Sequence, residues 1–176
     1  MDDNRRFPIG PFISQDTYPI EELANLIDII AASPAQYRQL VEKLVPEDLS
    51  KTYREGSWTV QQLVHHVADI QFVHFMRMKK ALTEPNYNEV TLIDMNAWAQ
   101  TPDAMEAPIT DSLLLLDGAT RRYVYLAKSL TNDQLAISYY HPVRQRSYSQ
   151  AQALAMTAWH VQHHLAHIKL ALAISE

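Results

Sequence analysis

Four of the eight histidines fall within eight residues near the C-terminal end of the chain: His160, His163, His164 and His167. On a helix that turns about 100° per residue, these four side chains lie on the same face. Relative to His160, they extend about 40° around the helix axis in one direction and roughly 60° in the other. Residues at i and i+4 have Cβ atoms about 5–6 Å apart, which lets two imidazoles bind one ion. An amphipathic helix with histidines on a solvated face is the alternative, but a stripe of four favours a divalent metal. Two pairs, His160/His164 and His163/His167, satisfy this spacing, so the spacing alone does not choose between them.

The composition limits what such a site can be. The chain has no cysteine, so a metal must be bound by nitrogen and oxygen ligands, and any thiol in the chemistry must come from a substrate or cosubstrate.

The net charge of −5 provides no basic surface for a nucleic acid, which we therefore exclude as a partner. No apolar run approaches the ~18 residues of a membrane span, and residues 1–6 lack the apolar stretch of a secretion signal. We expect a cytoplasmic protein with no membrane partner.

Hydrophobic periodicity predicts an all-α fold built from four long helices. A length of 176 residues suits a single domain, 1–176, and a content of only 3 glycines argues against a turn-rich β protein. Apolar residues recur at helical spacing in four segments, of which the first is one element kinked at Pro34. The predicted helices cover residues 20–44, 59–82, 111–130 and 149–173.

The connections predict how these helices are joined. Thr59 with Gln62, and Ser149 with Gln152, fit capping boxes at the starts of the second and fourth helices. Residues 83–110 form a long crossover with a short helical piece at 94–100, and residues 137–148 contain a short extended pair. Residues 1–17 are rich in proline and apolar residues, which indicates an arm packed on the body. We therefore predict a four-helix bundle of two antiparallel pairs, in which the crossover joins the second helix to the third.

The second helix carries three more histidines. His66 projects from the edge of its apolar stripe and is the inward candidate, whereas His65 lies about 100° further round and is expected to be solvated. His74, central in the stripe, is expected to be a core histidine with a local hydrogen-bond partner. His66 and the histidine stripe then share one cleft between the second and fourth helices. Three neutral histidines with open coordination positions describe a catalytic site, because structural zinc is usually closed by four protein ligands.

These motifs resemble those of the DinB superfamily, and most closely its YfiT branch of metal-dependent hydrolases. The resemblance rests on Gly56-Ser57-Trp58-Thr59 before the second helix, the His65-His66 pair, Trp98, Tyr140-His141-Pro142, and the segment from Trp159 to His167. It covers nearly the whole chain, from Pro8 to the final helix.

The resemblance implies a four-helix bundle, a zinc or nickel ion, and a homodimer. Carried over by position, the metal ligands are His66, His160 and His164. Many members of the superfamily have a glutamine in place of His167, which leaves the role of His167 open between a ligand and a residue that orients a ligand. The role of His163 is also open.

The leading hypothesis is a metalloenzyme whose ion activates water against a small-molecule substrate. An alternative, implied by thiol S-transferases in the superfamily, is transfer of a low-molecular-weight thiol such as bacillithiol. A third hypothesis is a metal-binding or stress-related module without turnover.

The catalytic residues beyond the metal ligands are not determined by the sequence. Asp69, one turn after His66, is a candidate to orient a ligand or take a proton, against the alternative of a solvated aspartate. His141, which precedes a proline in an irregular segment, is a candidate to line the cleft. Arg144 and Arg146 are candidates to bind an anionic substrate, although paired surface arginines are often only solvated.

Overall fold

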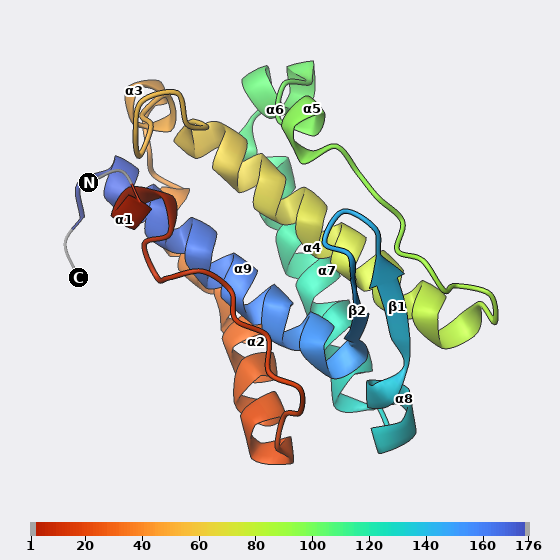
Figure 1. Cartoon of the computed structure of the whole chain (residues 1–176). Helices are drawn as coiled ribbons and strands as arrows, with labels where there is room; N and C mark the ends of the chain where they lie inside the picture. Colours follow the sequence, from red (N-terminus) through yellow and green to blue (C-terminus); the bar gives the residue numbers. More distant parts are fainter. Residues whose placement is uncertain (1–2, 175–176) are drawn as a thin grey trace.

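Four long helices form a bundle in the computed structural model, which describes residues 3–174 (Figure 1). The four are α2 (Ile20–Val41), α4 (Val60–Thr83), α7 (Ile109–Lys128) and α9 (Gln150–Ala171). Their positions confirm the four predicted helices, with ends that differ by at most three residues. Between and before them lie the short elements α1 (Asp3–Arg6), α3 (Pro46–Leu49), α5 (Met95–Trp98), α6 (Pro102–Glu106), α8 (Asn132–Ala136), β1 (Ser138–His141) and β2 (Arg146–Ser149).

The order of the helices around the bundle differs from their order in the chain. Helix α2 packs along α7 and α9, and α4 packs along the same two helices, so α2 and α4 occupy opposite corners. Figure 1 shows that α4 and α7 run in the same direction, and the connection between them returns along the length of the bundle. The predicted crossover is therefore present because parallel neighbours cannot be joined by a short turn. This order makes α4 and α9 neighbours.

Local side-chain hydrogen bonds set where the site-bearing helices begin. Thr59 and Gln62 form a capping box at the start of α4, and Ser149 and Gln152 form one at the start of α9, as predicted. In each box a hydroxyl accepts from a backbone N–H that has no partner within the helix. The rotational register of both helices is thus anchored at their first turn.

Pro34 lies inside α2 without ending it. A proline has no N–H to donate to the carbonyl four residues earlier, which here belongs to Ile30. The Ser33 hydroxyl donates to that carbonyl at 2.8 Å instead. The helix is one element, as predicted, and it ends at Val41 rather than at residue 44.

The apolar core runs through the bundle as two clusters of buried side chains, and all four long helices contribute to both. The first includes Tyr37, Leu63, Leu116 and Val161, and the second includes Ile30, Met78, Tyr123 and Leu154. Burying a side chain of this size stabilises the fold by about 1.5–3 kcal/mol. The bundle therefore has a hydrophobic core that does not depend on a bound ion.

The N-terminal arm runs along α9. The Arg5 guanidinium donates to the Tyr53 carbonyl at 2.8 Å, and the Trp159 indole N–H donates to the Gly10 carbonyl at 3.1 Å. Residues 1 and 2 of the predicted arm lie outside the described residues, as do residues 175 and 176 of the predicted domain. The arm covers the side of α9 that carries His163 and His167.

The predicted extended pair forms a small antiparallel hairpin. Strand β1 pairs with β2, with Ser138 opposite Ser149 and His141 opposite Arg146. The crossover joins this hairpin, because the Val90 N–H donates to the Tyr140 carbonyl at 2.9 Å. Within residues 3–174, none of the helices combines the length and the apolarity that crossing a bilayer requires.

Candidate metal centre

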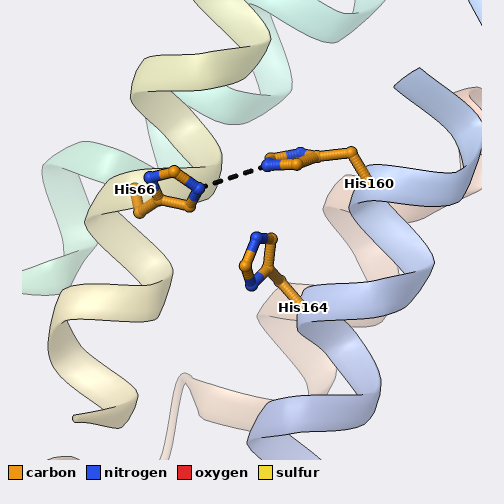
Figure 2. Close-up of side chains that lie close together, drawn as sticks. All are labelled: His66, His160 and His164. Carbon is orange, nitrogen blue, oxygen red and sulfur yellow. Dashed lines mark hydrogen bonds between the residues drawn. The ribbon is translucent and has the colours of Figure 1, made fainter. Parts of the chain in front are cut away.

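His66 on α4 faces His160 and His164 on successive turns of α9 (Figure 2). One ring nitrogen from each of the three lies within 4.8 Å of the others. The Nε2 atoms of His66 and His160 are 3.2 Å apart. Two nitrogens bound tetrahedrally to one ion at about 2.0–2.1 Å lie about 3.4 Å apart. The arrangement of these three imidazoles, which we call the histidine triad, therefore fits a single ion.

Burial keeps the histidine triad uncharged. Loss of solvation, together with repulsion from the nearby His163, lowers the pKa of His66 to about 3. The same loss of solvation, with repulsion from neighbouring imidazoles, holds the pKa values of His160 and His164 well below their usual range. Within residues 3–174, no carboxylate forms an ion pair or a hydrogen bond with these rings. Three neutral nitrogen donors suit zinc and other first-row divalent ions.

Aromatic side chains close one side of the histidine triad. The Trp58 ring lies 4.6 Å from the His66 ring and 6.4 Å from the His164 ring, measured between centroids. Trp58 immediately precedes the Thr59 cap of α4, so the capping box also places the indole. An indole beside the rings limits their rotation and excludes water from this side.

A chain of hydrogen bonds fixes which nitrogen of His164 is free. His167 Nε2 lies 3.2 Å from the Arg6 carbonyl oxygen, which can only accept, so this nitrogen carries the proton. His167 Nδ1 is then an acceptor, and it lies 3.3 Å from His164 Nδ1, which must donate to it. His164 Nε2 is left unprotonated. The N-terminal arm thus determines, through His167, that His164 presents a lone pair at Nε2.

The second pair at i,i+4 spacing on α9, His163 and His167, has a different environment from His160 and His164. His163, His164 and His167 also bring ring nitrogens within 4.8 Å of one another, but all three lie on α9. His167 stacks on Tyr53 with ring centroids 3.9 Å apart, and His163 stacks on Trp159 at 4.3 Å. His66 therefore joins His160 and His164, while His163 and His167 face the N-terminal arm.

His65 is buried, so the prediction that it is solvated is wrong. Its Nε2 donates to the Ala107 carbonyl at 3.1 Å, and its Nδ1 accepts from the Ser112 hydroxyl at 2.7 Å. The helical pattern placed His65 away from the apolar stripe, but the end of the crossover and the start of α7 cover that side of α4. His65 ties α4 to α7 and does not reach the histidine triad.

Asp69 is half-buried on the same side of α4 as His65. Burial, together with repulsion from Asp103, raises the pKa of Asp69 to about 6. Within the described part of the chain, Asp69 forms no hydrogen bond with a histidine. The geometry thus separates this candidate from the histidine triad.

His74 and His141 line one pocket together with His160. The Thr157 hydroxyl donates to the Ala153 carbonyl at 2.8 Å, so it accepts from His74 Nδ1 at 2.9 Å. His74 thus has the local partner predicted for it, and its Nε2 is unprotonated. Burial lowers the pKa of His74 to about 3.

Arg77 lines the same pocket and was not predicted from the sequence. It follows His74 by three residues, and the positions three and four residues away on either side carry no acidic side chain. The sequence signal available for Arg77 was an arginine within a helix that has no such acidic partner and lies on the same side as a buried histidine.

The chain matches the model of a known protein family over most of its length. The family model of the DinB superfamily matches residues 29–168. The chain therefore belongs to the DinB superfamily.

Similar proteins are YfiT and YfiT-like proteins of bacilli. A candidate metal-dependent hydrolase from Oceanobacillus iheyensis is 41% identical, over 95% of each chain. Another from Halalkalibacterium halodurans is 40% identical, over 96% of this chain and 97% of the relative. The solved structure of YfiT from Bacillus subtilis matches this chain with a TM-score of 0.92. The two are 32% identical in sequence, and the match covers 97% of this chain and 98% of that one. That protein is described as a metal-dependent hydrolase candidate with an unusual four-helix bundle topology.

Proposed function

We propose that this protein is a metal-dependent hydrolase that acts on a small molecule, with a divalent ion held by His66, His160 and His164. The observation that carries the proposal is the convergence of three neutral, largely buried imidazoles from two helices, with no carboxylate of residues 3–174 gathered with them. Three protein ligands leave coordination positions open for water and substrate, as in catalytic sites. A divalent ion bound there supplies a Lewis acid that lowers the pKa of a coordinated water to about 7.

His141 is the residue of this chain that we assign to proton transfer. It lines the pocket that reaches His160, and its buried Nδ1 has no hydrogen-bond partner within residues 3–174. Burial lowers its pKa, and Arg144 lowers it further, so the ring is neutral and able to accept a proton at pH 7. Asp69, the other candidate from the sequence, lies away from the histidine triad and has no part in this proposal.

Transfer of a low-molecular-weight thiol is the second candidate function. The absence of a carboxylate at the histidine triad, among the residues that the structure describes, favours it, because a thiol acidified by a metal needs no strong general base. The lack of any cysteine in the chain requires the thiol to come from a cosubstrate. Cytoplasmic location, a homodimer, and zinc or nickel as the physiological ion stay predictions.

The test begins with metal content, measured by inductively coupled plasma mass spectrometry on untagged protein. We expect about one ion per chain, and hydrolysis of a panel of esters and amides that the His164→Ala variant does not catalyse. Turnover only when bacillithiol and a model electrophile are supplied would assign the transferase. Fully metallated protein without turnover in either assay would support a metal-binding module, and no bound metal would overturn the proposal.

A further inference from the structure

A pocket of about 190 Å³ lies beside the histidine triad and is lined by His160. Its walls come from α4, α9, the β1–β2 hairpin and the crossover, which contributes Leu92, Ile93 and Met95. This volume is smaller than the roughly 300–1,000 Å³ of pockets for drug-sized ligands. A ligand in this pocket is therefore a small molecule whose reacting group can approach the histidine triad.

The charged side chains of the pocket are all positive. Arg77 and Arg144 line it, and no aspartate or glutamate of the described residues does, although the chain has 20 acidic residues and 15 basic ones. Neither arginine forms an ion pair with a carboxylate anywhere in residues 3–174. Two uncompensated guanidinium groups beside this pocket favour an anion, and a divalent ion at the histidine triad would add to the same field.

Each arginine is held in place while keeping donors available. Arg77 donates through Nε and Nη2 to the Thr91 carbonyl, at 3.2 and 2.7 Å, which leaves Nη1 without a partner among the described residues. The Arg144 guanidinium lies 5.8 Å from the Tyr148 ring centroid and 3.5 Å from the Tyr148 hydroxyl. Arg146 contacts the same ring at 4.8 Å but does not line the pocket.

The remaining lining is mostly apolar, with a few polar atoms that lack partners. Met78 and Met156 are among the apolar residues that surround the arginines. Gln150 is fully buried, and its Oε1 has no hydrogen-bond partner within the described residues. Buried polar atoms are nearly always satisfied in native proteins, so a ligand that enters the pocket has a hydrogen bond to complete.

We propose that this pocket binds the substrate of the protein, and that the substrate is a small organic anion, with an apolar body and a carboxylate or phosphate group held by Arg77 and Arg144. The proposal rests on the proposed function, because it places the reacting group of that anion toward His160. It adds the chemical class of substrate, which the histidine triad alone does not define.

The experiment measures binding to the full chain without metal, so that an anion cannot bind by coordinating an ion. Benzoate, hexanoate and phenyl phosphate are titrated and followed by two-dimensional NMR, with benzamide and hexanamide as uncharged counterparts. We expect at least one anion to bind more tightly than its uncharged counterpart. Charge-assisted hydrogen bonds are strong enough that Arg144→Gln should weaken this binding by about tenfold.

Arg146→Gln is the matched control, because it removes the same charge from the same hairpin outside the pocket. We expect it to leave anion binding within about twofold of wild type. Arg144 is exposed, so its replacement does not threaten the fold; Arg77→Gln is tested second, because Arg77 also holds Thr91.

Three outcomes would overturn the inference: no anion binds, the uncharged compounds bind as well as the anions, or Arg146→Gln weakens binding as much as Arg144→Gln. None of them depends on the metal. A protein that binds anions in the pocket but takes up no metal would instead overturn the proposed function.

Discussion

His66, His160 and His164 are expected to be individually necessary for metal binding. Alanine at any of these positions leaves two ligands, and we expect stoichiometric metal to be lost, as measured by mass spectrometry on untagged protein. His65→Ala is the control from the adjacent position. It should keep the metal while lowering the free energy of unfolding by about 1–3 kcal/mol, because Ser112 and Ala107 lose their partner. Metal loss in His65→Ala with retention in His66→Ala would show that the ligand on α4 is wrongly assigned.

His167 is expected to act on the metal through His164. In His167→Leu, the Nδ1–H of His164 loses its acceptor, so the ring is no longer held with Nε2 free. We expect metal affinity to fall by about 10- to 100-fold without the complete loss expected of His164→Ala. Competition with a fluorescent chelator measures the affinity.

His167→Gln supplies the control for this prediction. Its side-chain oxygen can accept the proton of His164, so affinity should recover toward wild type. If His167→Leu has wild-type affinity, or binds as poorly as His164→Ala, the proposed orienting role is incorrect.

The sequence predicted some of these residues better than others, for a physical reason. Hydrophobic periodicity identified the inward side of the second helix, and with it His66. It could not show that residues 107–112 would cover His65, since this depends on which helix becomes the neighbour of α4. The hydrogen bond from His167 to Arg6 joins residues far apart in the chain, and no local pattern encodes it.

At the scale of elements, the Ser149 capping box is expected to stabilise α9 measurably. Ser149→Ala leaves the N–H of Gln152 without its acceptor, which should lower the free energy of unfolding by about 1 kcal/mol. Urea denaturation monitored by circular dichroism measures the change. Ser147→Ala, an exposed position on the same strand, should have little effect, and an equal loss in both variants would count against the cap.

The helices and their caps were predictable because periodicity and capping boxes are local. The order α2, α7, α4, α9 around the bundle was less predictable. The sequence indicated a long crossover between the second and third helices, but the placement of α2 and α4 at opposite corners follows from how the apolar faces of all four helices pack together. The cap at Thr131 and Gln134 has the same pattern as the other two and was available in the sequence.

For the whole molecule, removal of metal is expected to leave the fold intact. The two core clusters are apolar and span all four long helices, so EDTA should not change the helical content seen by far-UV circular dichroism. The melting temperature should fall, because an ion that binds only the folded state stabilises it by mass action. Loss of helical signal at 25 °C after chelation would show instead that the ion is structural.

Acid is expected to destabilise the metal-free protein through its buried histidines. Burial lowers the pKa of His74 from 6.5 to about 3. Between these values the unfolded chain binds a proton that the folded chain does not, so the free energy of unfolding falls as the pH falls. One such histidine contributes up to about 1.4 kcal/mol per pH unit. Asp69 acts in the opposite direction, because its raised pKa of about 6 gives stability at low pH that is lost as the pH rises through 6.

Several buried histidines oppose this single carboxyl group, so their effect should dominate. Urea denaturation of metal-free protein at pH 7, 6 and 5 should show a steady loss of stability. His74→Asn retains a donor toward Thr157 but does not titrate, so the loss should be shallower in this variant. A wild-type stability that is constant or rises from pH 7 to 5 would mean that the folded protein binds at least as many protons as the unfolded chain over this range, and so that burial does not keep these imidazoles neutral.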